Sequence, residues 1–386
     1  MGSNPSRRAI PRKKNPPARK SATDTGCIIL KPSRDPIGNR VKRTAPVVLL
    51  LATSAIVFSC QAPPVPEAVP TPPPSFSDLT PEGLGASDLI TRSYTWSYWP
   101  CRDHEWTWEL RIPQGLYDYY RAKPRPPTND YTVYVTDPRD TAYTDELARR
   151  LQEEAHKRGF DENDAVHFAA SFVQKLPYAL DIETTGYDEY PRYPIETLVD
   201  EGGDCEDTSI LLAKLLNTMG YDVVLVDLTT HIAVGVLEGQ GFCGTYYRHN
   251  GKRYFYLETT GEAGRAGVVP SEYRTQPAYI YDIVPAAIVT HSWKASTEER
   301  GYRLTTVVQN LGTAVAHDIH ILAGFYAAEG RILNSSTSES FDLEAGQSAT
   351  ITAYLRSPKG IRTRLMVYVV AGDRSIDSSH SGWFET

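Results

Sequence analysis

The chain has 386 residues, of which 41% are hydrophobic and 23% are charged, and its net charge is −7. This length and apolar content suffice for two or three domains with real cores and exclude a wholly disordered protein. Residues 1–43 hold twelve Lys or Arg against two Asp or Glu, so the rest of the chain is strongly acidic. An acidic body repels phosphate backbones, and we expect no nucleic-acid partner.

The five cysteines are too few and too scattered for a disulfide scaffold. They are Cys27, Cys60, Cys101, Cys205 and Cys243. They form no CxxC pair and no cluster with histidines at zinc spacing, so no metal site is expected. No dinucleotide or phosphate-loop motif occurs, and the sequence therefore predicts no cofactor. Cys101 and Cys243 could pair in an oxidising compartment, but the sequence does not fix their separation.

An uncharged apolar stretch from Ala45 to Phe58 follows Lys42-Arg43. It is shorter than the roughly 20 residues of a membrane-spanning helix and has the form of a signal-peptide core. Val57-Phe58-Ser59-Cys60 resembles a lipoprotein signal box, which would make Cys60 the lipidated first residue of the mature protein. The alternative is an uncleaved signal anchor. Both interpretations place the body outside the membrane and tethered to it.

Proline and charge patterns predict how the chain is organised. Seven prolines within residues 61–74 predict a stiff, extended spacer. The long basic head fits a signal poorly, and the native start could lie near Val41. The expected divisions are a basic segment 1–43, a signal 44–60, a Pro-rich linker 61–78, a β-rich and helical part 79–160, a catalytic core 161–285 and a β-sandwich 286–386.

The part of the chain before the core motif mixes strand and helix patterns. Residues 90–135 contain short alternating runs rich in Tyr and Trp, which we interpret as strands whose aromatic face packs inward. Apolar residues at helical spacing predict helices over Asp145–Lys157 and Asp164–Leu176. Tyr178–Leu198 is expected to be a loop, because Pro191 and Pro194 interrupt any regular element.

A glycine pair then leads into a helix that carries a cysteine in its first turn. The segment reads Gly202-Gly203-Asp204-Cys205-Glu206-Asp207, followed by a strongly apolar run that ends at Gly220. Asp204 and Asp207 have the spacing of a capping box, and Gly220 suits a helix C-cap. The sequence therefore predicts a buried helix with Cys205 at its N-terminus.

Strand patterns follow the helix in two groups. Asp222–Leu228 and Ile232–Leu237 are β-branched runs, and Tyr246–His249 and Lys252–Leu257 flank an Asn-Gly hairpin turn. Further alternating runs lie at 303–309, 318–326, 348–355 and 362–370. We expect an α+β fold, in which a helix packs on an antiparallel sheet, followed by an all-β sandwich.

Three residues in this frame suit nucleophilic catalysis. A thiol attacks as thiolate, and the unpaired N–H groups of a helix N-terminus favour the anion of Cys205 and an oxyanion beside it. His231 begins a strand that can bring an imidazole beside the sulfur, and Glu258 ends another strand and could orient the ring. His249 is the rival base, although it adjoins the Asn-Gly turn. Glu206 and Asp207 suit capping better than acid catalysis.

These residues resemble the transglutaminase-like cysteine protease superfamily and its archaeal exported branch. The segments that resemble the superfamily are Gly-Gly-Asp-Cys-Glu-Asp, Thr-His-Ile-Ala-Val-Gly-Val from Thr230 and Tyr-Leu-Glu-Thr-Thr-Gly from Tyr256, within about residues 94–285. The segments Phe172–Tyr178 and Gly186–Pro194 resemble the archaeal exported branch. The resemblance implies a papain-like core with Cys205 as nucleophile and His231 as base. The family's third residue is an Asp before Pro-Thr, where this chain has Glu258 before Thr-Thr. Asp204, Glu206 and Tyr193 are added as candidates for binding substrate or oxyanion.

Three functions fit this reading. The first is hydrolysis of a peptide or isopeptide bond in a surface polypeptide, and the second is transamidation, in which an amine replaces water. The third is a surface binding module that retains the fold without turnover. The run Val307–Ala314 resembles immunoglobulin-like adhesion domains, which predicts a spacer or docking role for the sandwich.

Overall fold

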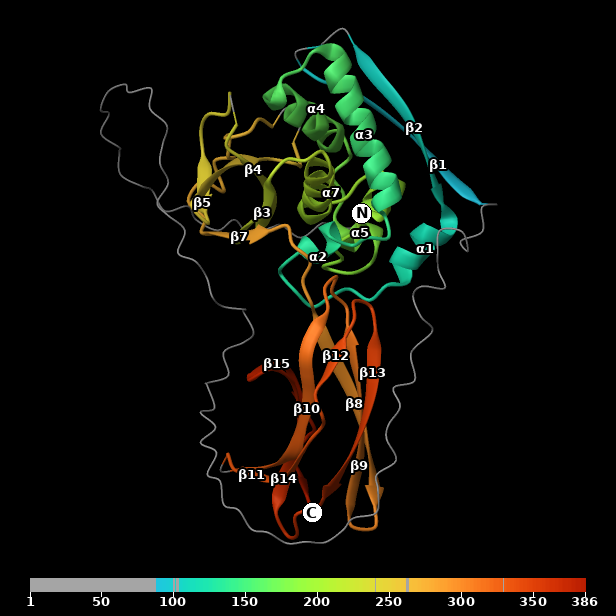
Figure 1. Cartoon of the computed structure of the whole chain (residues 1–386), viewed down its shortest axis with the longest axis vertical. Helices are drawn as coiled ribbons and strands as arrows, with labels where there is room; N and C mark the ends of the chain where they lie inside the picture. Colours follow the sequence, from blue (N-terminus) through green and yellow to red (C-terminus); the bar gives the residue numbers. More distant parts are fainter. Residues whose placement is uncertain (1–87, 100, 102–103, 240, 262–263, 329) are drawn as a thin grey trace, which may run out of the picture.

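The computed structural model describes residues 88–99, 101, 104–239, 241–261, 264–328 and 330–386. The basic segment, the signal with Cys60, and the Pro-rich linker lie outside these residues. Figure 1 shows a helical upper part beside a curved sheet and an elongated all-β lower part. Each part has a hydrophobic core of its own, and the sheet of the upper part has a further small core on its other face.

Helices are confined to the upper part among the described residues. They are α1 Gln114–Ala122, α2 Thr132–Val135, α3 Thr141–Arg158, α4 Glu162–Gln174, α5 Asp181–Thr184, α6 Pro194–Asp200 and α7 Cys205–Thr218. The core side chains of α7 are fully buried, because α3 and α4 cover one side of this helix and strands β3 Val223–Leu228 and β4 His231–Leu237 cover the other. α7 is therefore the central element of the upper part (Figure 1).

Five antiparallel strands form the sheet beside α7. Its order is β5-β6-β4-β3-β7, with β5 Tyr246–His249, β6 Lys252–Leu257 and β7 Ala278–Asp282. β3 and β4 form a tight hairpin in which Leu228 pairs with His231. β6 runs antiparallel to β4, so the end of β6 comes close to the start of β4. This topology brings His231 and Glu258 to the same edge of the sheet.

A separate two-stranded sheet, β1 Leu89–Ser97 and β2 Glu105–Pro113, packs on α4. Trp96 and Trp106 are 1% and 4% exposed, and their rings contact Phe172 and Phe168 at centroid distances of 5.1 and 4.8 Å. The aromatic stripe of this region therefore serves packing. Large aromatic pairs of this kind stabilise a core beyond their buried area.

The lower part is a sandwich of two antiparallel sheets. One sheet has the order β13-β9-β8, and the other has β11-β10-β14-β15 with β12 and β16 at its sides. The strands are β8 Val289–Glu298, β9 Gly301–Asn310, β10 Ala316–Ala327, β11 Ile332–Thr337, β12 Phe341–Leu343, β13 Ser348–Arg356, β14 Arg362–Ala371, β15 Arg374–His380 and β16 Phe384–Glu385. The hydroxyl groups of Thr136 and Thr313 lie 2.7 Å apart and join the two parts.

Two segments depart from the sequence-based expectation. Residues 114–135 are helical in α1 and α2, where strands were expected, and residues 178–198 contain α5 and α6 where a loop was expected. Pro194 opens α6 instead of interrupting it, because proline fits the first helical position, whose N–H has no helical partner in any case. α4 is capped by Asp161, whose side chain accepts from the N–H of Asp164 at 2.8 Å, so the helix begins earlier than expected.

Candidate active site

Cys205 is the first residue of α7 and is 9% exposed. Asp204 and Asp207 form the capping box that the sequence predicts, and the N–H of Asp204 donates to Asp207 at 3.2 Å. Both glycines before the helix are needed for close approach. A Cβ on Gly202 would lie 2.5 Å from the carbonyl oxygen of Pro177, and one on Gly203 would collide with the Asp207 side chain. The Gly-Gly turn thus sets the position of the thiol.

Strand β4 begins directly against this helix end. The Ser209 hydroxyl of α7 donates to the carbonyl of Ile232, the residue after His231, at 3.1 Å. The Thr259 hydroxyl lies 2.9 Å from that of Thr208 and 3.0 Å from that of Ser209. α7 is therefore tied both to the start of β4 and to the segment that follows β6.

His231 and Glu258 form a buried pair. Nε2 of His231 lies 3.1 Å from each carboxylate oxygen of Glu258, and the two residues are 5% and 6% exposed. Burial opposes ionisation of Glu258, but the hydrogen bond and charge of His231, with help from Tyr256 and Thr260, lower its pKa to about 2. Glu258 is thus an anion that orients the imidazole through Nε2, and Nδ1 is the ring nitrogen that this pair leaves open.

Two tyrosines flank the cysteine. The Tyr273 ring stacks on the His231 ring with a centroid distance of 4.2 Å and an interplanar angle of 3°. Tyr178, which is 55% exposed, is positioned by a bridge between its backbone and that of Gly203. The pKa of each tyrosine is raised, first by burial and then by nearby negative groups, which include Glu258 for Tyr273 and Cys205 for both. Tyr178 ends the segment 172–178 that resembles the exported branch of the family, whereas no sequence pattern marks Tyr273, which lies in a turn.

Glu206 engages the thiol directly. The Cys205 sulfur donates to Oε2 of Glu206 at 2.9 Å. Burial, followed by the charge of Glu206 and this hydrogen bond, raises the pKa of Cys205 well above its usual range. The helix terminus was expected to favour the thiolate, but here a neighbouring carboxylate and burial outweigh it. Glu206 is thus more than a helix-dipole residue.

A cleft of about 740 Å³ leads to this site. Its wall includes His231 and Glu206, together with Tyr131 and Glu189, and the hydroxyl of Tyr131 donates to Glu189 at 2.8 Å. The other lining residues are Arg125, Pro126, Pro127, Thr128, Asn129, Pro191, Asp227, Leu228, Thr229, Thr230 and Ile232. The cleft has the size of an ordinary ligand site.

Arg192 lies beneath the site in an ion-pair network. It is 1% exposed, and its guanidinium contacts Asp181 at 2.8 Å and also pairs with Asp207. Burial alone would lower the pKa of Arg192, and the two carboxylates raise it, so the guanidinium keeps its charge. Carboxylate oxygens of Asp181, Asp204 and Asp207 lie within 4.8 Å of one another, as in a cation site. Arg192 supplies positive charge to two of these three carboxylates.

The remaining sequence candidates occupy other positions. Tyr193 is 1% exposed, and its ring packs against Tyr120 and Tyr134 at centroid distances of 4.6 and 4.7 Å, so it lies in the core instead of lining the cleft. Burial and the charge of Glu206 raise the pKa of Asp204 to about 8. His249 pairs with Asp282 at 2.9 Å at the end of β5, whose partner residue starts β6. It is therefore at the opposite end of β6 from Glu258.

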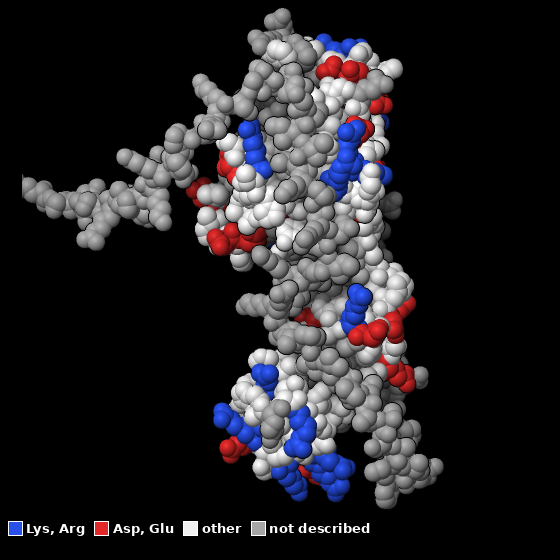
Figure 2. Space-filling view, turned by 90° about the vertical axis from the view of Figure 1, so that its left-hand side faces the viewer, with Lys and Arg blue, Asp and Glu red and all other residues white. Residues whose placement is uncertain are grey.

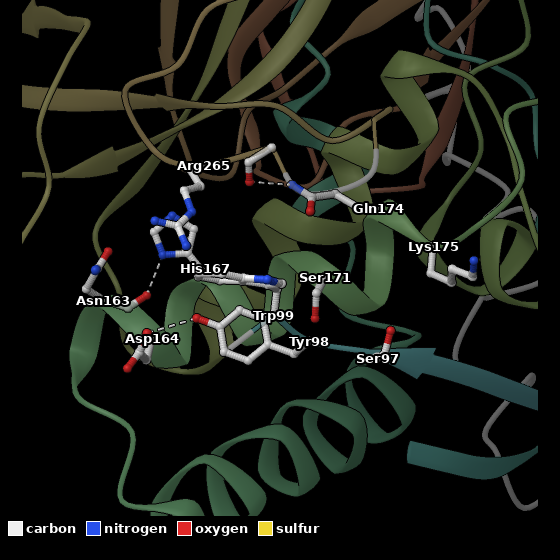
Figure 3. Close-up of a pocket in the computed structure, with 11 residues that line it drawn as sticks. Ser97, Tyr98, Trp99, Asn163, Asp164, His167, Ser171, Gln174, Lys175 and Arg265 are labelled. Atoms are coloured by element: carbon white, nitrogen blue, oxygen red, sulfur yellow. Dashed lines mark hydrogen bonds between the residues drawn. The ribbon is translucent and has the colours of Figure 1, made fainter. Parts of the chain in front are cut away.

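A second, smaller cavity is lined by residues of α4, of the end of β1 and of the segment after β6 (Figure 3). Gln174 donates to the carbonyl oxygens of Glu258 at 2.7 Å and Gly264 at 3.0 Å. His167 contacts the carbonyl of Asn163 through Nδ1 at 2.7 Å and accepts from the N–H of Ala266 through Nε2 at 2.9 Å. Both side chains fix the segment after β6 to α4, so we assign this region a supporting role for Glu258.

Cys101, Cys205 and Cys243 are free thiols in this structure. The disulfide considered between Cys101 and Cys243 is therefore not formed. No helix in the described part of the chain is long and apolar enough to cross a membrane.

No family model and no curated relative matches the chain. Among solved structures, red sea bream transglutaminase is similar at 10% identity over 72% of this chain and 60% of that chain, with a TM-score of 0.19. A protein from Archaeoglobus fulgidus is similar at 12% identity over 25% of this chain and 94% of that chain, with a TM-score of 0.17. A glycoside hydrolase family 2 β-glucuronidase is similar at 13% identity over 25% of this chain and 11% of that chain, with a TM-score of 0.20. The similarity to a transglutaminase is therefore weak.

Proposed function

We propose that this chain is a transglutaminase-like cysteine hydrolase that acts on a polypeptide outside the cell and is tethered to the membrane through its N-terminal segment. The observation that carries the proposal is the shared location of three groups. Cys205 begins α7, which packs on β4 and is joined to the residue after His231 through Ser209, and His231, which begins β4, is held by Glu258 through both carboxylate oxygens. This arrangement supports a nucleophile, a base and an orienting acid.

The proposed reaction has two stages. His231 takes the thiol proton at Nδ1, the sulfur bonds to the substrate carbonyl carbon, and the C–N bond breaks as the imidazolium gives its proton to the leaving amine. Water then attacks the thioester while His231 accepts its proton, and the acid product and the thiol are released. The unpaired N–H groups at the start of α7 would hold the oxyanion in both stages.

Transamidation uses the same groups and differs only in that an amine replaces water in the second stage. Incubation of cell-envelope polypeptides with the protein, followed by mass spectrometry, separates the outcomes. New chain ends support hydrolysis and new cross-links support transamidation, and a Cys205→Ala protein should give neither.

One observation favours a binding module as the second candidate. The thiol donates to Glu206, and its raised pKa keeps it neutral, as in an unreactive cysteine. Alkylation of Cys205 by iodoacetamide, followed at the level of the peptide, tests this. We expect His231→Ala to slow alkylation at neutral pH by more than about tenfold. His249→Ala is the matched control, because that imidazole also pairs with a carboxylate but at the other end of the sheet. Equal rates in the parent and both variants would favour the binding module.

A further inference from the structure

The end of the β-sandwich that points away from the upper part carries a concentration of basic side chains. We call it the distal basic patch, and it consists of Arg300, Arg331, Arg356, Lys359 and Arg362, all of which are exposed. Figure 2 shows Lys and Arg side chains gathered at the lower end of the molecule, over the sandwich. A patch of this sign stands out on a chain whose body is acidic.

Strand register places these residues together although they come from three connections. Arg300 lies in the β8–β9 turn, and its carbonyl accepts from the N–H of Ser357 at 3.4 Å. Arg356 pairs with Gly301, the first residue of β9, while Arg362 begins β14. Arg331 lies in the connection between β10 and β11. The last residue of β10 pairs with Thr363, the residue after Arg362, so this connection lies at the same end as the start of β14. The opposite ends of these strands lie near Thr313, which contacts the upper part.

The cations of the distal basic patch are not neutralised by described carboxylates. None of its five cations forms an ion pair with a carboxylate among the residues described for this chain. The described carboxylates at this end are Glu298, Glu299 and Glu385, and Glu298 is paired with Arg303 at 3.3 Å. Charge repulsion among unpaired cations opposes folding slightly, and an anionic partner would remove that cost.

Two exposed aromatic residues accompany the patch. Tyr354 is 58% exposed and Trp383 is 41% exposed. The guanidinium of Arg303 lies over the Tyr354 ring at 5.2 Å, and that of Arg364 lies over the Trp383 ring at 5.0 Å. Tyr354 belongs to one sheet and Trp383 follows a strand of the other, so the aromatic residues lie on both sides of the sandwich.

We propose that the distal basic patch docks on an anionic lipid surface. The cations come from connections of both sheets and surround the end of the sandwich, so a flat surface can contact all of them at once. A single polymer chain would lie along one face. Tyr and Trp are enriched where proteins meet the headgroup layer, and clustered Lys and Arg bind anionic headgroups. This inference is independent of the chemistry at Cys205.

Sedimentation of the full chain with lipid vesicles tests the proposal. The vesicles contain phosphatidylcholine alone or with 30% phosphatidylglycerol. The patch variant changes the five cations to Gln. The matched control is Arg149→Gln, Arg150→Gln, Lys157→Gln, Lys252→Gln and Arg253→Gln, which removes the same charge from exposed or partly exposed residues that are ion-paired elsewhere. Both variants keep the basic N-terminal segment, so its binding contributes equally.

We expect the affinity of the patch variant for anionic vesicles to be lower than that of the control variant by a factor of at least about ten. The reason is that each cation near an anionic surface raises the binding constant several-fold. The difference should vanish at 0.5 M NaCl and on phosphatidylcholine alone. Equal binding by the two variants would overturn the proposal. Unchanged vesicle binding with lost retention on an alginate matrix would also overturn it, and would identify an acidic polysaccharide as the partner.

Discussion

Glu258 offers both carboxylate oxygens to Nε2 of His231, each at 3.1 Å, so the imidazole is fixed in orientation and in tautomer. The same carboxylate accepts from the Tyr256 hydroxyl at 2.5 Å and from the N–H groups of Thr259 and Thr260 at 2.9 and 3.0 Å. These donors hold the carboxylate of Glu258 in place against the imidazole.

Replacement of Glu258 should slow thiol chemistry without abolishing it. Glu258→Gln retains a hydrogen-bonding oxygen but loses the charge, and we expect Cys205 alkylation at pH 7 to fall about tenfold, with a larger loss in Glu258→Ala. Glu272→Gln, at an exposed carboxylate beside Tyr273, is the control and should leave the rate unchanged. An Ala variant as reactive as the parent would remove Glu258 from the site.

The low pKa of Glu258 also predicts an effect on stability. Because its pKa falls from 4.5 to about 2 on folding, its ionised form stabilises the protein above about pH 4.5. This contribution is lost as the pH falls from about 4.5 to 2. The free energy of unfolding, measured by urea titration, should therefore decline less steeply over this range in Glu258→Gln than in the parent. Parallel curves for the two proteins would show that Glu258 is not ionised at such low pH.

Glu206 should control the reactivity of the thiol. Removal of its charge in Glu206→Gln takes away the largest electrostatic contribution that raises the pKa of Cys205. We expect the pH at which alkylation is half-maximal to fall by about one unit, since a near like charge shifts a pKa by that order. Glu189→Gln should give a smaller shift, because Glu189 does not contact the sulfur. If Glu206→Gln leaves the profile in place, burial alone raises the pKa.

Periodicity predicted the elements of the site better than the segments around it. Residues 246–249 and 252–257 form strands with the expected bounds because an Asn-Gly turn and alternating side chains agree there. α1 was not expected because its tyrosines also fit a strand, and tertiary packing decided between the two. β7, β8 and β15 were not expected either, because their side chains alternate less clearly, and β7 in addition pairs with β3, which is distant in sequence.

Candidate site residues could be predicted from the sequence only where their position at the start of a helix or strand indicates a role. Cys205 precedes an apolar helix and His231 begins a strand, so their roles could be inferred from sequence position. Tyr273 could not, because it stacks on His231 from a turn that has no pattern of its own. The effect of Glu206 depends on the rotamer that turns its carboxylate toward the sulfur, and sequence spacing does not fix a rotamer.

The cleft should prefer cationic reagents. Glu189 and Glu206 line it, and its one basic lining residue, Arg125, is bound by both carboxylate oxygens of Glu196 at 2.6 and 2.8 Å. Cationic 2-aminoethyl methanethiosulfonate should therefore modify Cys205 at least tenfold faster than the anionic 2-sulfonatoethyl reagent. The exposed Cys243 provides the comparison within the same protein.

The double variant Glu189→Gln, Glu206→Gln should reduce this preference toward the value for Cys243. High salt should reduce it as well, although less than at a fully exposed site. A preference that persists in the double variant would show that the selectivity arises from charges outside the cleft.

Thr259 should matter for both stability and chemistry. Its side chain is fully buried, and its hydroxyl joins the segment after β6 to Thr208 and Ser209 in α7. Thr259→Val keeps the shape and removes both hydrogen bonds, while Thr208 and Ser209 still donate to the carbonyls of Asp204 and Ile232, so we expect a loss of about 0.5–1.5 kcal/mol of unfolding free energy for each hydrogen bond removed. The loss should also slow Cys205 alkylation, since the helix end is no longer fixed against Glu258.

The control is Thr352→Val, at an exposed strand position, which should change the unfolding free energy by less than about 0.5 kcal/mol. Urea titration and alkylation of the two variants check this together. Reduced stability with an unchanged alkylation rate would mean that the hydroxyl stabilises the fold without positioning the thiol.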